Sequence, residues 1–341
     1  MTRTHMAREI AEIPLAATRF LTESREAVQT AAEAFRAADP DLVITVARGS
    51  SDHAASYLKY AIELLAGVPV ASVGPSVASI YGRPLRLRQA ACIGISQSGQ
   101  SPDIVAMMRA AMQAGGLGLA ITNHANSPIA QASTYCLPLL AGTEQSVAAT
   151  KTFVISILAG LALLAEWQED IALQQAVTQA PRAFAAALEL DWSPLTQRLE
   201  NASSAFVLGR GPAFAIACEA ALKFKETCGL HAEAYSAAEV LHGPAALVEA
   251  QFPVLAFAIE DAALPHVVAT AQRLVAQGAD VFLTGANAAR AVTLPVVTGV
   301  HPLLAPLVLA VGFYGFVETL SRQRGYDPDL PRHLRKVTET R

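Results

Sequence analysis

The sequence predicts an α/β protein made of two similar halves, each a parallel sheet sandwiched between helices in three layers. Short apolar runs alternate with longer helical stretches along most of the 341 residues. The runs are apolar throughout, which is typical of strands buried on both faces of a parallel sheet. The turns TVARGS (45–50) and VLGRGP (207–212) superpose at an offset of 162 residues, so a duplicated domain is the simplest account.

The expected elements follow in chain order. Residues 5–38 are predicted to be helical because Ala, Glu and Arg fill the polar face, and Pro14 marks a break. Strands of the first half are predicted at 42–47, 68–72, 90–96, 117–122 and 135–140. A glutamine-rich helical stretch at 166–200 precedes second-half strands at 205–209, 252–259, 280–285 and 293–298.

These patterns divide the chain into five parts. They are an N-terminal helical segment (1–38), a first domain (39–170), a helical linker (171–200), a second domain (201–325) and a C-terminal tail (326–341).

The composition excludes several classes of protein. Charged residues make up 16% of the chain and the net charge is −4, so we expect no basic face that binds nucleic acid or acidic lipids. The longest apolar runs, 153–165 and 303–317, are shorter than the roughly 20 residues that cross a bilayer. The N-terminus has no apolar signal region, so we expect a cytoplasmic protein.

The four cysteines are expected to be reduced core residues. Cys92, Cys136, Cys218 and Cys228 lie mostly in apolar runs and form no Cys-x-x-Cys pair. The eight histidines show no metal-ligand spacing either, so we predict no metal site and no cofactor.

A serine-rich loop follows the apolar strand at 90–96, in the stretch IGISQSGQSPD (93–103). A turn from a strand into a helix presents free backbone N–H groups where the helix dipole favours an anion. Ser96, Ser98 and Ser101 add hydroxyl donors, Gly99 permits close approach of a ligand, and Pro102 suits the first helical position. Neutral donors at a helix start predict a site for a phosphate monoester.

The alternative is that Ser101 only caps the helix and the other serines are solvated loop residues. The loop is neither a Walker loop nor a Gly-x-Gly-x-x-Gly turn. The offset of 162 places Ala258, Glu260 and Ala263 where the first half has its serines, so only the first half is expected to bind the anion. A second turn of the same kind, ARGSSDHA (47–54), carries Gly49, Ser50 and Ser51 and can flank the same ligand.

Three charged residues lie on one stripe of the apolar segment that begins at Cys218. Glu219, Lys223 and Glu226 fall within about 60° of one another around a helix, whereas Lys225 points elsewhere. An ordinary i,i+4 ion pair explains Glu219 and Lys223, but it explains Glu226 less well. A partly desolvated carboxylate beside a lysine can move a proton between adjacent carbons of a sugar.

His242 lies in LHGPAAL (241–247), where Gly243 and Pro244 predict a turn that presents its ring from a loop. A lone loop histidine is more often a surface residue than a catalyst, although its titration range suits proton transfer near neutral pH.

Several of these segments resemble one enzyme family. They are SQSGQSPD (96–103), GTEQSVAATKTF (142–153), EAALKFKETCGLHAEAYSAAEVLHGPAAL (219–247) and DLPRHLRKVTE (329–339). Together they are similar to the isomerase half of glutamine–fructose-6-phosphate aminotransferase (glucosamine-6-phosphate synthase), which consists of two SIS (sugar isomerase) domains. The resemblance covers nearly the whole chain from about residue 40.

The resemblance implies a role for each candidate residue. The family's phosphate loop corresponds to Ser96, Gln97, Ser98 and Ser101, and its sugar-binding turn to Gly49, Ser50 and Ser51, with Val147 nearby. Its proton-shuttling glutamate corresponds to Glu226, accompanied by Glu219 and Lys223. Its ring-opening histidine, donated by the neighbouring subunit of a homodimer, corresponds to His242, and its Schiff-base lysine to Lys336.

The chain also departs from the synthase. Met1 is followed by Thr2 in place of the glutaminase cysteine, so we expect no release of ammonia from glutamine. Arg48-Gly49-Ser50-Ser51 stands where the family has Cys-Gly-Thr-Ser, and Ala149 replaces a serine. Both changes bear on which sugar epimer is accepted.

The sequence thus predicts an isomerase that deaminates an amino-sugar phosphate, glucosamine 6-phosphate to fructose 6-phosphate and ammonia. Double-SIS chains of this type also resemble other phosphosugar isomerases, ketosamine-phosphate deglycases and galactosamine-phosphate deaminases. A non-catalytic phosphosugar-binding regulator is the alternative of another class. Such a sensor needs only the phosphate loop, whereas Glu226, His242 and Lys336 are all present here.

Overall fold

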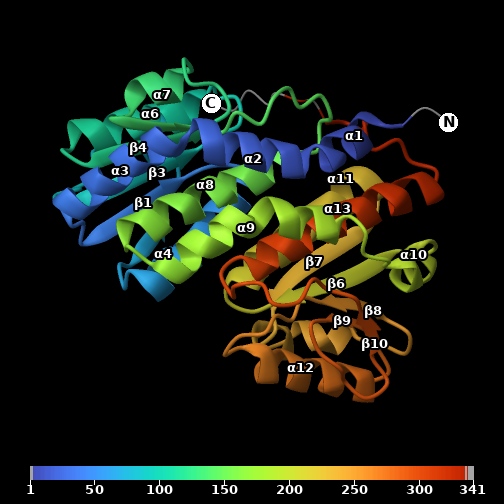
Figure 1. Cartoon of the computed structure of the whole chain (residues 1–341). Helices are drawn as coiled ribbons and strands as arrows, with labels where there is room; N and C mark the ends of the chain where they lie inside the picture. The colour runs from blue at the N-terminus through green and yellow to red at the C-terminus, as the bar shows by residue number, and fades with distance from the viewer. Residues whose placement is uncertain (1–2, 335, 337–341) are drawn as a thin grey trace. The chain divides into compact units, whose positions relative to one another are not determined.

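The chain folds around two parallel five-stranded sheets with helices on both faces, as predicted (Figure 1). The computed structural model describes residues 3–334 and 336. Its residues form two units: an N-terminal unit of Glu12–Glu144 and Lys151–Pro181, and a C-terminal unit of residues 3–11, Gln145–Thr150 and Arg182–Lys336.

The sheet of the N-terminal unit has the order β2-β1-β3-β4-β5 with every pair parallel. Its strands are β1 (Leu42–Val46), β2 (Val70–Ser72), β3 (Ala90–Ile95), β4 (Leu117–Thr122) and β5 (Tyr135–Pro138). All five lie within the predicted apolar runs. Each residue of the central strand β3 is buried, which explains why the run has no polar alternation.

Helices cover both faces of this sheet. One face carries α6 (Pro102–Gln113) and α7 (Pro128–Ala132), whose side chains join those of β1 and β3 in one apolar cluster. The other face carries α3 (Arg25–Ala38), α4 (Ser50–Leu65) and α8 (Lys151–Trp167). Every residue of α8 except Glu166 is buried, which explains why most of this helix is apolar. Within the described residues, no helix is long and apolar enough to span a membrane.

The C-terminal unit repeats this arrangement. Its strands β6 (Ser204–Gly209), β7 (His231–Ser236), β8 (Pro253–Ala256), β9 (Asp280–Thr284) and β10 (Val292–Leu294) have the order β7-β6-β8-β9-β10, again parallel. Helices α11 (Pro212–Cys228) and α13 (Ala305–Gln323) pack together over β6 and β7, and α12 (Leu264–Ala276) packs on a separate apolar cluster with β8 and β9. The same order in both sheets supports the predicted duplication.

The remaining elements are further helices, most of them short. They are α1 (His5–Ala11), α2 (Ile13–Glu23), α5 (Ser76–Ser79), α9 (Ile171–Ala187), α10 (Ser193–Leu199), η1 (Glu239–Leu241) and η2 (Pro244–Leu247).

Two expectations about local structure need correction. The helical region 5–38 is broken twice, before Pro14 as predicted and again at Ser24, whose buried hydroxyl donates to the Pro138 carbonyl at 2.7 Å. Strand β7 was not predicted, because its sequence HAEAYS contains polar residues and only Ala232 is fully buried. It pairs with a single neighbour, β6, at the edge of the sheet.

The burial of Cys92 gives a prediction about its reactivity. Burial raises the pKa of this thiol to about 12, so almost no reactive thiolate forms at pH 8. We expect Cys92 to resist iodoacetamide in the native protein and to react after unfolding in urea, as measured by mass spectrometry. Rapid native labelling of Cys92 would show that β3 is not a buried central strand.

Candidate functional site

Both predicted ligand-binding turns lie at the carboxyl ends of two neighbouring strands, β1 and β3. The chain leaves β1 to form β2 on one side and returns to form β3 on the other, with Val46 opposite Gly94. Ligands of open α/β sheets bind at such a reversal of strand order. Residues 47–49 follow β1 and lead into α4, whose first residues are Ser50 and Ser51, and turn 96–101 follows β3, so the N-terminal unit places the two segments at one edge of the sheet.

The serine loop holds its own shape through short-range hydrogen bonds. The Gly99 N–H donates to Ser96 Oγ at 3.1 Å, and the Gln100 N–H donates to Ser98 Oγ at 3.3 Å. Asn123 N–H donates to the Gln97 carbonyl at 3.1 Å and ties the loop to the end of β4. Gly99 has φ +64°, a backbone conformation that favours glycine.

Ser101 stands at the N-cap of α6, but its hydroxyl makes no capping hydrogen bond. Simple capping therefore does not explain this serine. Its side chain stays half-buried at the start of a helix whose free N–H groups favour an anion.

An ion pair joins the two turns. Arg48 Nε and Nη2 both donate to Asp103 Oδ2 at 2.7 Å, and the Ile104 N–H donates to Asp103 Oδ1 at 2.9 Å. The Asp103 side chain is fully buried, whereas that of Arg48 is 47% exposed. The guanidinium therefore places a positive charge beside the serine loop, fixed by a carboxylate at the start of α6.

The sequence interpretation missed Asp103. Its position directly after Pro102 could have indicated a structural role, because a carboxylate in the first turn of a helix interacts favourably with the helix dipole. The neighbouring Asp52 has a raised pKa because burial outweighs the opposing charges of His53 and Arg48.

In the C-terminal unit, α11 brings Glu219, Lys223 and Glu226 together as predicted. Lys223 Nζ lies 3.0 Å from Glu219 Oε1 and 2.7 Å from Glu226 Oε2. The hydroxyl of Tyr314 also donates to Glu219 Oε1 at 3.0 Å. Lys225 faces away, is exposed, and donates to the Ala232 carbonyl at 3.1 Å.

Burial differs sharply within this triad. The side chains of Lys223 and Glu219 are 0% and 1% exposed, whereas that of Glu226 is 19% exposed. Desolvation lowers the pKa of Lys223, but the charges of Glu219 and Glu226 and their hydrogen bonds outweigh it, so the pKa is raised. Lys223 is therefore a permanent cation, and Glu226 is the one carboxylate of the triad that reaches the surface.

The other predicted residues of this unit lie on connecting segments. Lys336 Nζ donates to the Ser146 carbonyl at 2.6 Å, which places the lysine next to Val147 in the segment Gln145–Thr150. His242 is exposed after η1, and its backbone N–H donates to the Glu239 carbonyl at 2.9 Å. Among the described residues, no hydrogen bond or ion pair joins His242 to Glu226.

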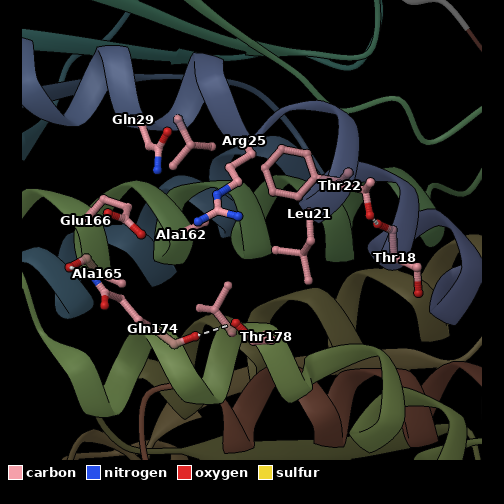
Figure 2. A pocket seen from close by; sticks show the side chains of 13 residues that line it. Thr18, Leu21, Thr22, Arg25, Gln29, Ala162, Ala165, Glu166, Gln174 and Thr178 are labelled. Carbon is pink, nitrogen blue, oxygen red and sulfur yellow. Dashed lines mark hydrogen bonds between the residues drawn. The ribbon is translucent and has the colours of Figure 1, made fainter.

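Figure 2 shows a different cleft of the N-terminal unit, of about 380 Å³, between α2, α3, α8 and α9. Arg25, Glu166 and Gln174 lie around an apolar floor that includes Val177. None of the predicted site residues lines this cleft.

Removing the buried cation tests the triad. Lys223→Met leaves Glu219 buried without its main counter-ion, and we expect a loss of about 3–5 kcal/mol in the free energy of unfolding. Urea denaturation measures it. The matched control is Lys225→Met, two residues along the same helix and exposed, where we expect a change of less than about 1 kcal/mol. Equal effects of the two substitutions would contradict the buried triad.

Gly99→Ala tests the shape of the serine loop. The added Cβ would lie 2.1 Å from Ser127 Oγ and 2.5 Å from Ser127 Cβ, at a positive φ. Gly67→Ala, also at positive φ but in open space, is the control and should cost about 1–2 kcal/mol of stability. We expect Gly99→Ala to cost about 1–3 kcal/mol more in thermal or urea unfolding, since overpacking adds to the strain. A smaller loss than in the control would refute this loop geometry.

Comparison with known proteins identifies the family. The SIS domain profile matches residues 38–166 and 198–288. Glutamine–fructose-6-phosphate aminotransferase of Zymomonas mobilis is 33% identical over 333 residues, which cover 87% of this chain and 53% of that protein. The enzyme of the same name from Bradyrhizobium diazoefficiens is 35% identical over 305 residues, covering 84% of this chain and 50% of that enzyme. The chain thus spans about half the length of the curated relatives that it matches.

Solved structures agree with this assignment. A candidate phosphosugar isomerase from Silicibacter pomeroyi is 52% identical with a TM-score of 0.93, covering 96% of this chain and 100% of that one. The C-terminal domain of glucosamine-fructose-6-phosphate aminotransferase from Francisella tularensis is 26% identical with a TM-score of 0.85. The match covers 97% of this chain and 98% of that one. The chain therefore belongs to the SIS domain family, with one SIS domain on each of its two sheets.

Proposed function

We propose that the protein is an amino-sugar-phosphate isomerase and deaminase that converts glucosamine 6-phosphate to fructose 6-phosphate and ammonia. The observation that carries the proposal is the triad on α11, in which a buried lysine cation holds a carboxylate that reaches the surface. A phosphate-binding regulator has no use for such a group, because burying the charges of Lys223 and Glu219 is costly unless function requires it.

The proposed substrate class follows from the N-terminal unit. Hydroxyls and backbone N–H groups of the serine loop, with Arg48 beside them, suit a phosphate dianion, and fixing the phosphate limits how the sugar can lie. Gly49, Ser50 and Ser51, on the adjoining turn, are proposed to bind the sugar. The relatives' names support this class, since they concern fructose 6-phosphate and phosphosugars.

The proposed chemistry is a proton transfer followed by hydrolysis. Glu226 removes the proton from C2 of the open-chain aldehyde, which gives an enolamine, and returns a proton to C1. The product is a ketimine at C2; water adds to it and ammonia leaves, which yields the ketose phosphate. Lys223 holds Glu226 in place through its 2.7 Å contact.

Four further residues complete the proposal. His242 helps to open the sugar ring, and its exposed loop position suits donation across the interface of a homodimer. Lys336 polarises the sugar carbonyl or forms a Schiff base with it. Arg48 and Ala149, which differ from the synthase pattern, are proposed to set the accepted epimer.

Glu226→Gln tests the proposal directly. The amide has the size of the carboxylate but accepts no proton, so ammonia release from glucosamine 6-phosphate should fall by roughly 100-fold or more, with binding retained. Glu249→Gln, an exposed residue of the same unit, should leave turnover unchanged. Near wild-type release by Glu226→Gln would remove Glu226 from the mechanism.

The wild-type protein should be assayed in parallel on a panel of hexosamine and ketosamine phosphates. Exchange of the C2 proton with solvent and ammonia release support the deaminase. Interconversion of neutral aldose and ketose phosphates without ammonia would instead show a plain isomerase. Binding with no exchange and no turnover would show a regulator.

A further inference from the structure

Glu9 is a buried carboxylate that belongs neither to the serine loop and its ion pair nor to the triad on α11. It lies on α1 and is only 4% exposed. A buried carboxylate is costly unless its oxygens accept strong hydrogen bonds, so its partners indicate what it is there to hold.

Those partners all belong to one segment, Gln145–Thr150. Glu9 Oε1 accepts the Gln145 N–H, both carboxylate oxygens accept the Ser146 N–H at 3.3 Å, and Oε2 accepts the Ser146 hydroxyl. Two consecutive backbone amides and a side chain therefore converge on one carboxylate. These contacts hold the peptide unit between Gln145 and Ser146 and also the Ser146 side chain.

The opposite side of Ser146 holds Lys336. The Ser146 carbonyl accepts from Lys336 Nζ at 2.6 Å, and Ser146 itself is 1% exposed. The N–H and the carbonyl of Ser146 belong to adjacent peptide units that meet at its Cα, so Glu9, by holding the N–H and the side chain, restrains the Cα from which the carbonyl projects. The position of the Lys336 amine thus depends on Glu9 through one intervening residue.

The position of α1 is in turn fixed by the C-terminal segment. The N–H groups of His5 and Met6 donate to Asp329 Oδ2 and Oδ1 at 2.6 and 2.9 Å. The Thr4 hydroxyl donates to Glu318 Oε1 on α13 at 2.8 Å. A helix of only seven residues is marginal alone, so these contacts decide where Glu9 lies.

We propose that Glu9 is a positioning residue, which sets the Lys336 amine and the substrate-contacting segment around Val147 through Ser146. The contacts close a ring within the C-terminal unit, from the tail at Asp329 through α1 and Ser146 back to the tail at Lys336. The catalytic consequence rests on the proposed function, in which Lys336 acts on the sugar carbonyl. The positioning of the Lys336 amine by Glu9 does not depend on that function.

The first experiment needs no substrate. Native protein is acylated with a limiting amount of acetic anhydride at pH 8, and the modification of Lys336 is measured by mass spectrometry against Lys225 as internal reference. Loss of one hydrogen bond corresponds to roughly a fivefold change, so Glu9→Ala should raise the relative labelling of Lys336 about fivefold or more. Glu9→Gln keeps one accepting oxygen and should give a smaller rise. Glu23→Ala, an exposed glutamate of α2, should give none.

Unchanged Lys336 labelling in folded Glu9→Gln and Glu9→Ala would overturn the proposal. Circular dichroism shows whether each variant is folded. If Glu9→Ala does not fold, the labelling of Glu9→Gln alone decides the test.

A second experiment uses the reaction. Glu9→Ala should lower kcat in the wild-type background but cause little further loss in a Lys336→Ala background, because the residue acts through Lys336. If the loss of kcat caused by Glu9→Ala is the same in both backgrounds, Glu9 does not act through Lys336. If no amino-sugar phosphate is turned over at all, the proposed function fails, whereas the labelling result still decides whether Glu9 positions Lys336.

Discussion

The charged face of α11 depends on one buried cation. Lys223 is fully buried, so its charge must be balanced where it lies, and Glu219 and Glu226 do this from one helical turn on either side. The spacing of the three residues follows from helix geometry, since positions three and four apart share a face. Most of the other buried residues of α11 are apolar, because they pack against α13 and the sheet, whereas Lys225 faces solvent.

The two sheets have the same strand order, as expected for a duplication, but the serine loop occurs only in the N-terminal unit. The offset places Ala258, Glu260 and Ala263 where the first half has Ser96, Ser98 and Ser101. A small pocket of the C-terminal unit, about 80 Å³, lies at the carboxyl ends of β8 and β9 and is lined by Glu260 together with mostly apolar residues. A carboxylate at this point repels a phosphate, so the second copy is suited to stability and to carrying α11 rather than to binding an anion.

Most of the fold could be predicted from the sequence because strands buried on both faces produce uninterrupted apolar runs. Nine of the described strands overlap such runs, two of them (β6 and β10) beginning one residue earlier than predicted. Strand β7 does not, since an edge position leaves its residues half-exposed and allows polar ones. The charged stripe was equally predictable, because it depends on local helical spacing. Pairing between distant segments was not: Arg48 with Asp103, and Glu9 with Ser146, are brought together only by tertiary structure. A charged residue beside a proline or on a short helix gives no sign in the sequence of which partner it will meet.

The charge balance of the triad determines which atom is left to act. Two carboxylates share one ammonium group, so with all three ionised one unit of negative charge is uncompensated. Glu219 gains a second donor in Tyr314 and is withdrawn from solvent, whereas Glu226 has the shorter contact with Lys223 yet remains partly exposed. The excess charge therefore lies at the surface end of the triad, on Glu226. A carboxylate held in this way is fixed in direction and accessible from solvent, which is the combination that the proposed proton transfer between neighbouring carbons requires.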